Sequence, residues 1–167
     1  IQIEGKEIPY TFFNEHIIID PTYLKTGLNA VTIDFIAGNL SLNRNEDFLY
    51  TLFVPDRAAT CFPLFDQPNL KASYEITLTI PAGWEAVSNG KSKEVNSKSG
   101  KTEIKFAKTK PISSYLVAFA AGKFNKVSRV VHDRSMTMYY RETDSVKVKR
   151  NLDDIFDLHG KSLAWLE

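Results

Sequence analysis

Residues 50–72 read YTLFVPDRAATCFPLFDQPNLKA, and this central stretch decides how the chain folds. It interleaves three phenylalanines with three prolines, namely Phe53, Phe62 and Phe65 with Pro55, Pro63 and Pro68. Each proline fixes its own φ angle and removes a backbone N–H donor, so the stretch cannot continue as a regular helix. We therefore expect an ordered crossing that large apolar side chains anchor to a core.

Two further side chains of the central stretch are expected to be structural. Asp66 precedes Gln67-Pro68, where a carboxylate suits a turn by accepting hydrogen bonds from nearby backbone N–H groups. Cys61 is the only cysteine and cannot form an internal disulfide. We expect it to be a small buried apolar side chain and not a reactive thiol.

Length and composition indicate one globular domain. The 167 residues are 43% hydrophobic and 25% charged, and the formal net charge is +1. This length is sufficient for one core without disulfides or metals. The small net charge argues against a nucleic-acid partner, and no apolar run approaches the ~20 residues that cross a membrane. The chain begins at Ile1 without a signal-like run, so we expect a piece of a longer protein whose compartment stays open.

Before the central stretch, the pattern predicts short strands. Residues 1–20 predict two of them, joined by a turn near Gly5. Val31, Ile33 and Phe35 alternate with polar residues, which predicts a half-buried strand. Residues 38–48 are polar and irregular, and they predict a surface loop.

After the central stretch, residues 74–80 give the clearest alternation, with one apolar and one polar face. Asn89-Gly90 predicts a tight hairpin. Residues 91–110 carry seven lysines. They suit either a patch for phosphate backbones or a solvated hairpin with a protected edge, and we favour the hairpin because no arginine or exposed aromatic is interleaved. Residues 112–121 predict a central strand, and 127–131 and 136–140 predict two more.

From Asp144 onward the apolar period becomes helical, with Asp144 as the expected N-cap. The apolar positions are Val148, Leu152, Ile155, Phe156, His159, Leu163 and Leu166. We therefore predict an all-β body of two packed antiparallel sheets, a saddle-like sandwich over residues 1–142, followed by one C-terminal helix over residues 143–167.

The central stretch resembles the N-terminal domain of the aminopeptidase N family, the gluzincin zinc aminopeptidases. The similarity consists of Tyr-Thr-x-Phe-x-Pro, then Phe-Pro-x-Phe-Asp-Gln-Pro, then Leu-Lys-Ala before an alternating strand. The resemblance implies that residues 1–142 form the N-terminal β domain and that the helix leads into a downstream catalytic domain. Its partners would be that domain and a peptide substrate. The structural motif residues are Phe62, Pro63, Phe65, Asp66 and Pro68.

A zinc peptidase of this class needs two histidines one helical turn apart with a glutamate between them. The three histidines, His16, His132 and His159, are not followed by Glu-x-x-His. We therefore expect no metal site and no activity in this segment, and one zinc ion in the full-length protein. His132 beside Asp133 is interpreted as a turn pair and not as a catalytic dyad.

Three functions stay open. The segment is the N-terminal domain of an active zinc aminopeptidase, a stand-alone β-sandwich module that binds carbohydrate or protein, or a scaffold relative of the family that has lost its metal site. The terminal helix favours the first and the third, because a self-contained sandwich has no use for a helix with an apolar stripe.

One departure from the resembled family concerns the substrate. The family commonly carries a glutamine after the threonine and a glutamate before the proline of this segment, and both reach the catalytic cleft to hold the substrate's amino group. Here those positions are Leu52 and Val54. Either the register differs or this wall of the cleft is apolar, and we favour the apolar wall because Tyr50, Thr51, Phe53 and Pro55 keep the family register. Neither side chain can accept a hydrogen bond.

Overall fold

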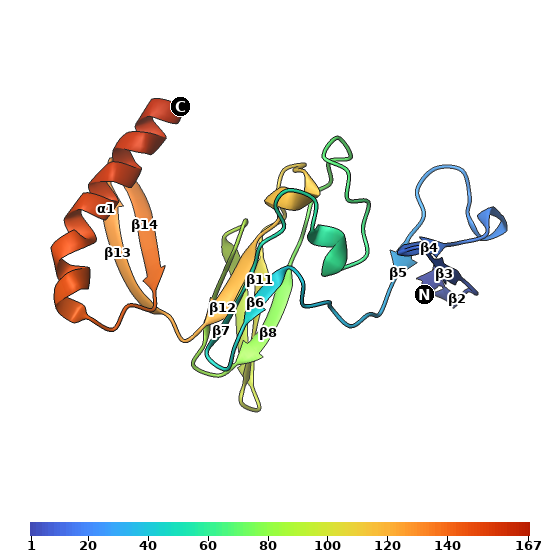
Figure 1. Ribbon diagram of the computed structural model, residues 1–167, viewed down its shortest axis with the longest axis horizontal. Coiled ribbons are helices and arrows are strands. Elements are labelled where there is room, and N and C mark those ends of the chain that lie inside the picture. Colours follow the sequence, from blue (N-terminus) through green and yellow to red (C-terminus); the bar gives the residue numbers. More distant parts are fainter.

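The computed structural model describes residues 1–167, except for the side chain of Glu94. Figure 1 shows three groups of elements along the long axis: N-terminal strands at one end, a β-sandwich in the middle, and a hairpin with one helix at the other end. Among the described residues, the one helix longer than a single short turn is α1 (Ser145–Leu166). The prediction of an all-β body followed by one C-terminal helix is confirmed.

The N-terminal group contains two small antiparallel sheets. The first has the order β2-β1-β5 and the second is a hairpin of β3 and β4. Their bounds are β1 (Gln2–Ile3), β2 (Lys6–Glu7), β3 (Thr11–Phe13), β4 (His16–Ile18) and β5 (Val31–Thr32). A short 3-10 turn, η1 (Pro21–Tyr23), follows β4. The predicted turn lies at Glu4-Gly5, where both residues have positive φ angles of 49° and 77°. The strand predicted through Phe35 is shorter than expected, because its pairing with β1 ends at Thr32.

The central group is the sandwich. One sheet has the order β10-β11-β8 and the other has the order β6-β7-β12-β9, and all neighbouring strands are antiparallel. Their bounds are β6 (Leu42–Arg44), β7 (Phe48–Thr51), β8 (Thr77–Pro81), β9 (Glu85–Ser88), β10 (Ser92–Lys98), β11 (Lys101–Phe106) and β12 (Phe119–Gly122). Ile80 and Ile104 of one sheet share a buried cluster with Ala86 and Ala121 of the other. The two packed sheets are therefore found within residues 42–122, and the remaining strands form separate small sheets.

The alternation predicted for residues 74–80 is present. Ile76, Leu78 and Ile80 are half-buried or buried, whereas Thr77 and Thr79 between them are exposed. The lysine-rich segment forms the β10–β11 hairpin, with β10 at the outer edge of its sheet. The apolar face of β8 supplies one side of the sandwich core.

The hairpin predicted at Asn89-Gly90 is wrong. β9 pairs with β12, whereas β10 pairs with β11. Asn89-Gly90 therefore connects a strand of one sheet to a strand of the other sheet. The Asn89 side chain accepts from the Ala118 N–H at 2.8 Å and donates to the Leu116 carbonyl at 3.0 Å. A Cβ at Gly90 would lie 2.1 Å from the carbonyl oxygen of Ala107. Asn89 therefore binds the backbone of the 116–118 segment through its side chain, and Gly90 allows the backbone to pass close to Ala107. The dipeptide does not form a two-residue turn.

Two other expectations need correction. The loop predicted for residues 38–48 contains β6, which pairs with β7. The strand predicted for residues 112–121 is divided into a 3-10 turn, η3 (Ser114–Leu116), and β12. The side chains of Ser113 and Ser114 are bound to the central stretch, and these bonds turn the chain before β12 begins.

The C-terminal group pairs β13 (Asn125–Val131) with β14 (Arg134–Tyr140) and packs α1 against the hairpin. The predicted N-cap is confirmed, because the Asp144 carboxylate accepts from the N–H groups of Val146 and Lys147 at 3.0 Å each. Phe156 is buried, and a Cβ at Gly160 would lie 2.5 Å from Val131 Cγ1. None of the helices that the structure describes is long and apolar enough to cross a membrane.

Candidate functional site

The segment that follows β7 presents apolar side chains to solvent from a well-held backbone. Leu52 is 50% exposed and Val54 is 57% exposed, whereas Phe53 between them is only 2% exposed. The Leu52 N–H donates to the Ser41 carbonyl at 2.9 Å, and the Arg57 N–H donates to the Phe53 carbonyl at 2.8 Å. Leu52 and Val54 therefore point away from the core, while the buried Phe53 side chain fixes the backbone between them.

Phe53 belongs to the second buried cluster of the sandwich, together with Ala58, Cys61 and Val117. Its ring meets the Phe62 ring edge to face, with centroids 5.4 Å apart and an interplanar angle of 79°. Cys61 is buried as predicted, and burial raises the pKa of its thiol. The central stretch is thus anchored directly beneath its exposed residues.

Asp66 joins the central stretch to the turn before β12. One carboxylate oxygen accepts from the Ala59 N–H at 3.0 Å, and the other accepts from the hydroxyl of Ser114, which is 1% exposed. Burial raises the pKa of Tyr74, and the negative charge of Asp66 raises it further. The Asp66 carboxylate therefore accepts hydrogen bonds from both a backbone N–H of the η2 turn (Ala58–Thr60) and the buried Ser114 hydroxyl.

The remaining motif residues differ in their surroundings. The Pro68 carbonyl accepts from the Ser113 hydroxyl at 2.6 Å, and Pro63 is half-buried. Phe65 is 81% exposed, so the expectation that it anchors the central stretch is wrong. The bonds of Asp66 and Pro68 already hold this end of the stretch, which leaves the Phe65 ring free to face outward.

Sequence reasoning missed the role of Thr51. Its hydroxyl accepts from the Phe119 N–H at 3.1 Å and donates to the Phe119 carbonyl at 3.4 Å. The Thr51 side chain therefore takes the place of a backbone hydrogen bond between β7 and β12, at the point where the chain leaves the sheet. The sequence feature that could have indicated this role is a threonine at the end of a strand, shortly before the proline-containing segment.

The histidines lie apart from this segment. His16 is in β4, His132 is in the turn between β13 and β14, and His159 is in α1. Over residues 1–167, with the Glu94 side chain set aside, no group of three His, Cys, Asp or Glu side chains is placed to hold a metal ion. The described side chains therefore do not form a zinc site.

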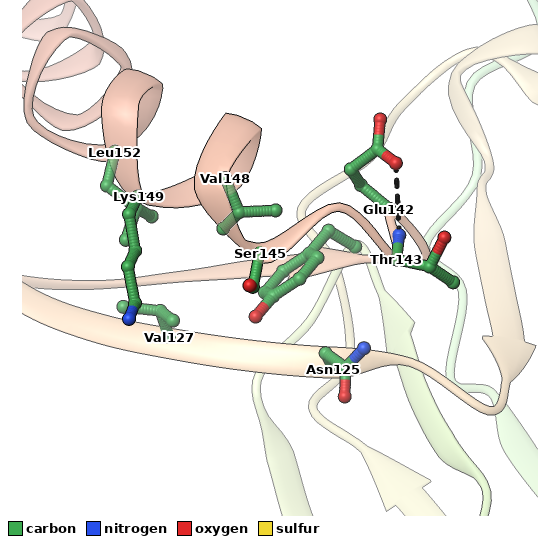
Figure 2. Close-up of a pocket in the computed structure, with 9 residues that line it drawn as sticks. Asn125, Val127, Glu142, Thr143, Ser145, Val148, Lys149 and Leu152 are labelled. Carbon is green, nitrogen blue, oxygen red and sulfur yellow. Dashed lines mark hydrogen bonds between the residues drawn. The ribbon is translucent and has the colours of Figure 1, made fainter.

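A cavity of about 440 Å³ lies between the hairpin and the start of α1. Figure 2 shows Val127 on the strand, Val148 and Leu152 on the helix, and Lys149 pointing toward the strand. Glu142, one of the lining residues, accepts from the Thr143 N–H at 3.0 Å and pairs with Lys147, and this pairing lowers the pKa of Glu142. The Glu142 carboxylate is therefore already bound to backbone N–H groups just before α1 and to Lys147 in its first turn.

The comparison with known families matches residues 39–116 to the Peptidase M1 N-terminal domain, and this range contains the whole central stretch. The chain is 39% identical over 89 residues to human glutamyl aminopeptidase, covering 51% of this chain and 9% of that protein. It is 30% identical over 126 residues to aminopeptidase N of Streptomyces lividans, covering 74% and 14%. It is 30% identical over 132 residues to aminopeptidase M1 of Arabidopsis thaliana, covering 76% and 15%. The chain thus spans a small part of the length of these relatives.

Proposed function

The chain belongs to the M1 peptidase family, where it corresponds to the N-terminal domain, and we propose that it acts as the non-catalytic β domain of a zinc-dependent enzyme that removes N-terminal residues from peptides. The observation that carries this proposal is the family match over residues 39–116, which covers the central stretch and both sandwich sheets up to η3. The names of the relatives support an aminopeptidase. The zinc ligands would come from the catalytic domain, because the side chains that the structure describes supply no such group.

We propose that one role of the domain is to support the catalytic domain. Large exposed apolar side chains support this role, because an interface with a second domain needs such surface. On the sandwich they include Leu52, Val54, Phe65 and Leu116, and on α1 they include Val146, Leu158, Trp165 and Leu166. Covering them with a catalytic domain would remove this surface from water.

The second proposed role is to form one wall of the substrate cleft. Leu52 and Val54 are exposed on a backbone that Phe53 and the Ser41 carbonyl hold in place, as a preformed wall requires. Neither side chain offers a hydrogen-bond acceptor or a negative charge. The substrate's amino group would then be held by carboxylates of the catalytic domain, and the wall would favour substrates whose first residue is large and apolar.

The other two functions predict different behaviour. A stand-alone module would carry a ligand site of its own, and a scaffold relative would hold the same wall beside an inactive centre. The match to the family and the names of its relatives favour an enzyme over a binding module. Hydrolysis by the full-length protein separates an enzyme from a scaffold.

The specificity test uses the full-length enzyme with Leu52→Gln and Val54→Glu. We expect kcat/KM for leucine substrates to fall about tenfold relative to alanine substrates, equivalent to about 1.4 kcal/mol of differential transition-state binding. The measurement is kcat/KM for alanine, leucine and arginine substrates.

The matched control is Val95→Glu, which adds the same charge at an exposed valine on β10. It should leave all three values unchanged. If the double variant keeps the preference of the parent enzyme, Leu52 and Val54 do not line the cleft, and the wall proposal is wrong while the family membership stands.

A further inference from the structure

Asn89-Gly90 is the one asparagine–glycine pair in the chain, and its side-chain amide can react with the backbone. The backbone nitrogen of the residue after an asparagine can attack the side-chain amide carbon. A bond forms between these two atoms, the bond from that carbon to Nδ2 breaks, and the amide nitrogen leaves as ammonia. Water then opens the cyclic succinimide and leaves aspartate or isoaspartate. Glycine hinders this attack least, because it has no Cβ.

The folded chain holds the Asn89 amide at both of its polar atoms. Oδ1 accepts from the Ala118 N–H at 2.8 Å, and Nδ2 donates to the Leu116 carbonyl at 3.0 Å. Closing the ring draws the amide carbon to the Gly90 nitrogen and expels Nδ2. Because these movements break the hydrogen bonds to the 116–118 segment, the native contacts add to the barrier of the reaction.

The backbone on either side of the amide is held as well. Ser88 is the last residue of β9, and its hydroxyl donates to the Ala118 carbonyl at 2.9 Å. On the other side, the Ala107 N–H donates to the Lys91 carbonyl at 2.8 Å. Gly90 lies so close to Ala107 that a Cβ would be 2.1 Å from its carbonyl oxygen. Residues 88–91, the connection from β9 to β10, therefore cannot rotate freely into the conformation that closes the ring.

We propose that Asn89 is a deamidation site: the folded domain suppresses the reaction, opening of the 88–91 connection allows it, and the product weakens the connection. The co-reactant is water, which enters as ammonia leaves, so that the amide becomes a carboxylate. Because the reaction does not reverse, a chain that has opened keeps the change after it closes again. The modified residue therefore marks a chain in which this connection has opened.

The product cannot restore the native contacts. An aspartate has no side-chain N–H, so the Leu116 carbonyl would face a carboxylate oxygen in place of the amide nitrogen. The carbonyl then loses its donor and lies beside a negative charge, which makes the contact unfavourable. Isoaspartate also lengthens the backbone by a methylene group, because the chain continues through the former side-chain carbon. Deamidation therefore favours further opening of the 88–91 connection.

The test is peptide mapping by mass spectrometry after the 167-residue chain is incubated in buffer and in guanidinium chloride, at the same neutral pH and temperature. Circular dichroism checks that the chain is folded in the first solution and unfolded in the second. We expect Asn89 to deamidate at least about tenfold more slowly in the folded chain. In the unfolded chain it should react faster than Asn96, which precedes Ser97, because glycine hinders the attack less than serine.

Two results would overturn the proposal. Equal rates at Asn89 in the two solutions would show that the native contacts do not suppress the reaction. An Asn89 that stays unmodified in guanidinium chloride would show that it is not a deamidation site.

Asn89→Asp tests the effect of the product on the fold. The midpoint of guanidinium unfolding should fall by about 0.3 M or more, because the Leu116 carbonyl loses its donor. The matched control is Asn69→Asp, the same change at an exposed residue in the turn that the Leu70 N–H closes on the Gln67 carbonyl at 3.0 Å. The control should shift the midpoint by about 0.1 M or less. Equal midpoints for the two variants would contradict the proposal, since the product would then leave the connection as stable as before.

Discussion

Phe53→Ala is expected to lower the free energy of unfolding by about 3–5 kcal/mol, the cost of removing a buried aromatic ring from a packed core. Phe53 is 2% exposed and shares a buried cluster with Ala58, Cys61 and Val117. Its edge-to-face contact with Phe62 is lost as well. Because domains of this size are stable by only about 5–15 kcal/mol, the urea midpoint of the 167-residue chain should fall by a large fraction.

The neighbouring residue provides the control for this prediction. Val54 is 57% exposed, so Val54→Ala should change the free energy of unfolding by no more than about 0.5 kcal/mol. Phe53→Leu should lie between the two, because leucine refills part of the space. Equal midpoints for Phe53→Ala and Val54→Ala would show that the central stretch is not anchored by its buried phenylalanine.

Asp66→Ala is expected to cost about 1.5–3 kcal/mol, because a charged acceptor is removed and a buried donor is left without a partner. The donor is the Ser114 hydroxyl, which is 1% exposed, whereas the exposed Ala59 N–H can bind water instead. Urea denaturation measures the loss. The pKa of Tyr74 should fall part of the way toward its ordinary value, since the charge of Asp66 is the smaller of its two causes.

Two variants check the origin of that loss. Asp56→Ala changes an exposed carboxylate in the same stretch and should stay within about 0.5 kcal/mol of the parent chain. The double variant Asp66→Ala with Ser114→Ala removes both partners and should be more stable than Asp66→Ala alone. A double variant whose losses simply add would show that the two side chains are not coupled.

Periodicity allowed much of the fold to be predicted from the sequence. The face of residues 74–80 and the face of α1 up to Phe156 follow from side-chain direction alone, and the Asp144 cap follows from its place before a helical pattern. The rest of the predicted apolar stripe of α1, His159, Leu163 and Leu166, is exposed. The exposure of Leu52 and Val54 follows from the same alternation once Phe53 is placed inside. These features depend on residues that are close in the sequence.

Contacts between distant segments could not be predicted in this way. The bond between Asp66 and Ser114 joins residues 48 positions apart, and it turns a segment whose apolar pattern predicted a strand. Asn89 likewise serves residues 27 and 29 positions away instead of a local turn. The number of sheets also depends on which strands pair with each other, and the alternation of apolar and polar residues does not specify the pairing.

The central claim is that this domain lends an apolar wall to the cleft of a zinc aminopeptidase. A crystal structure of the full-length enzyme with a bound, uncleaved peptide analogue that begins with leucine measures it most directly. The account predicts side-chain atoms of Leu52 or Val54 within about 4.5 Å of the ligand's first side chain. A polar residue of the domain in that place, or both side chains beyond about twice that contact distance, would contradict the claim.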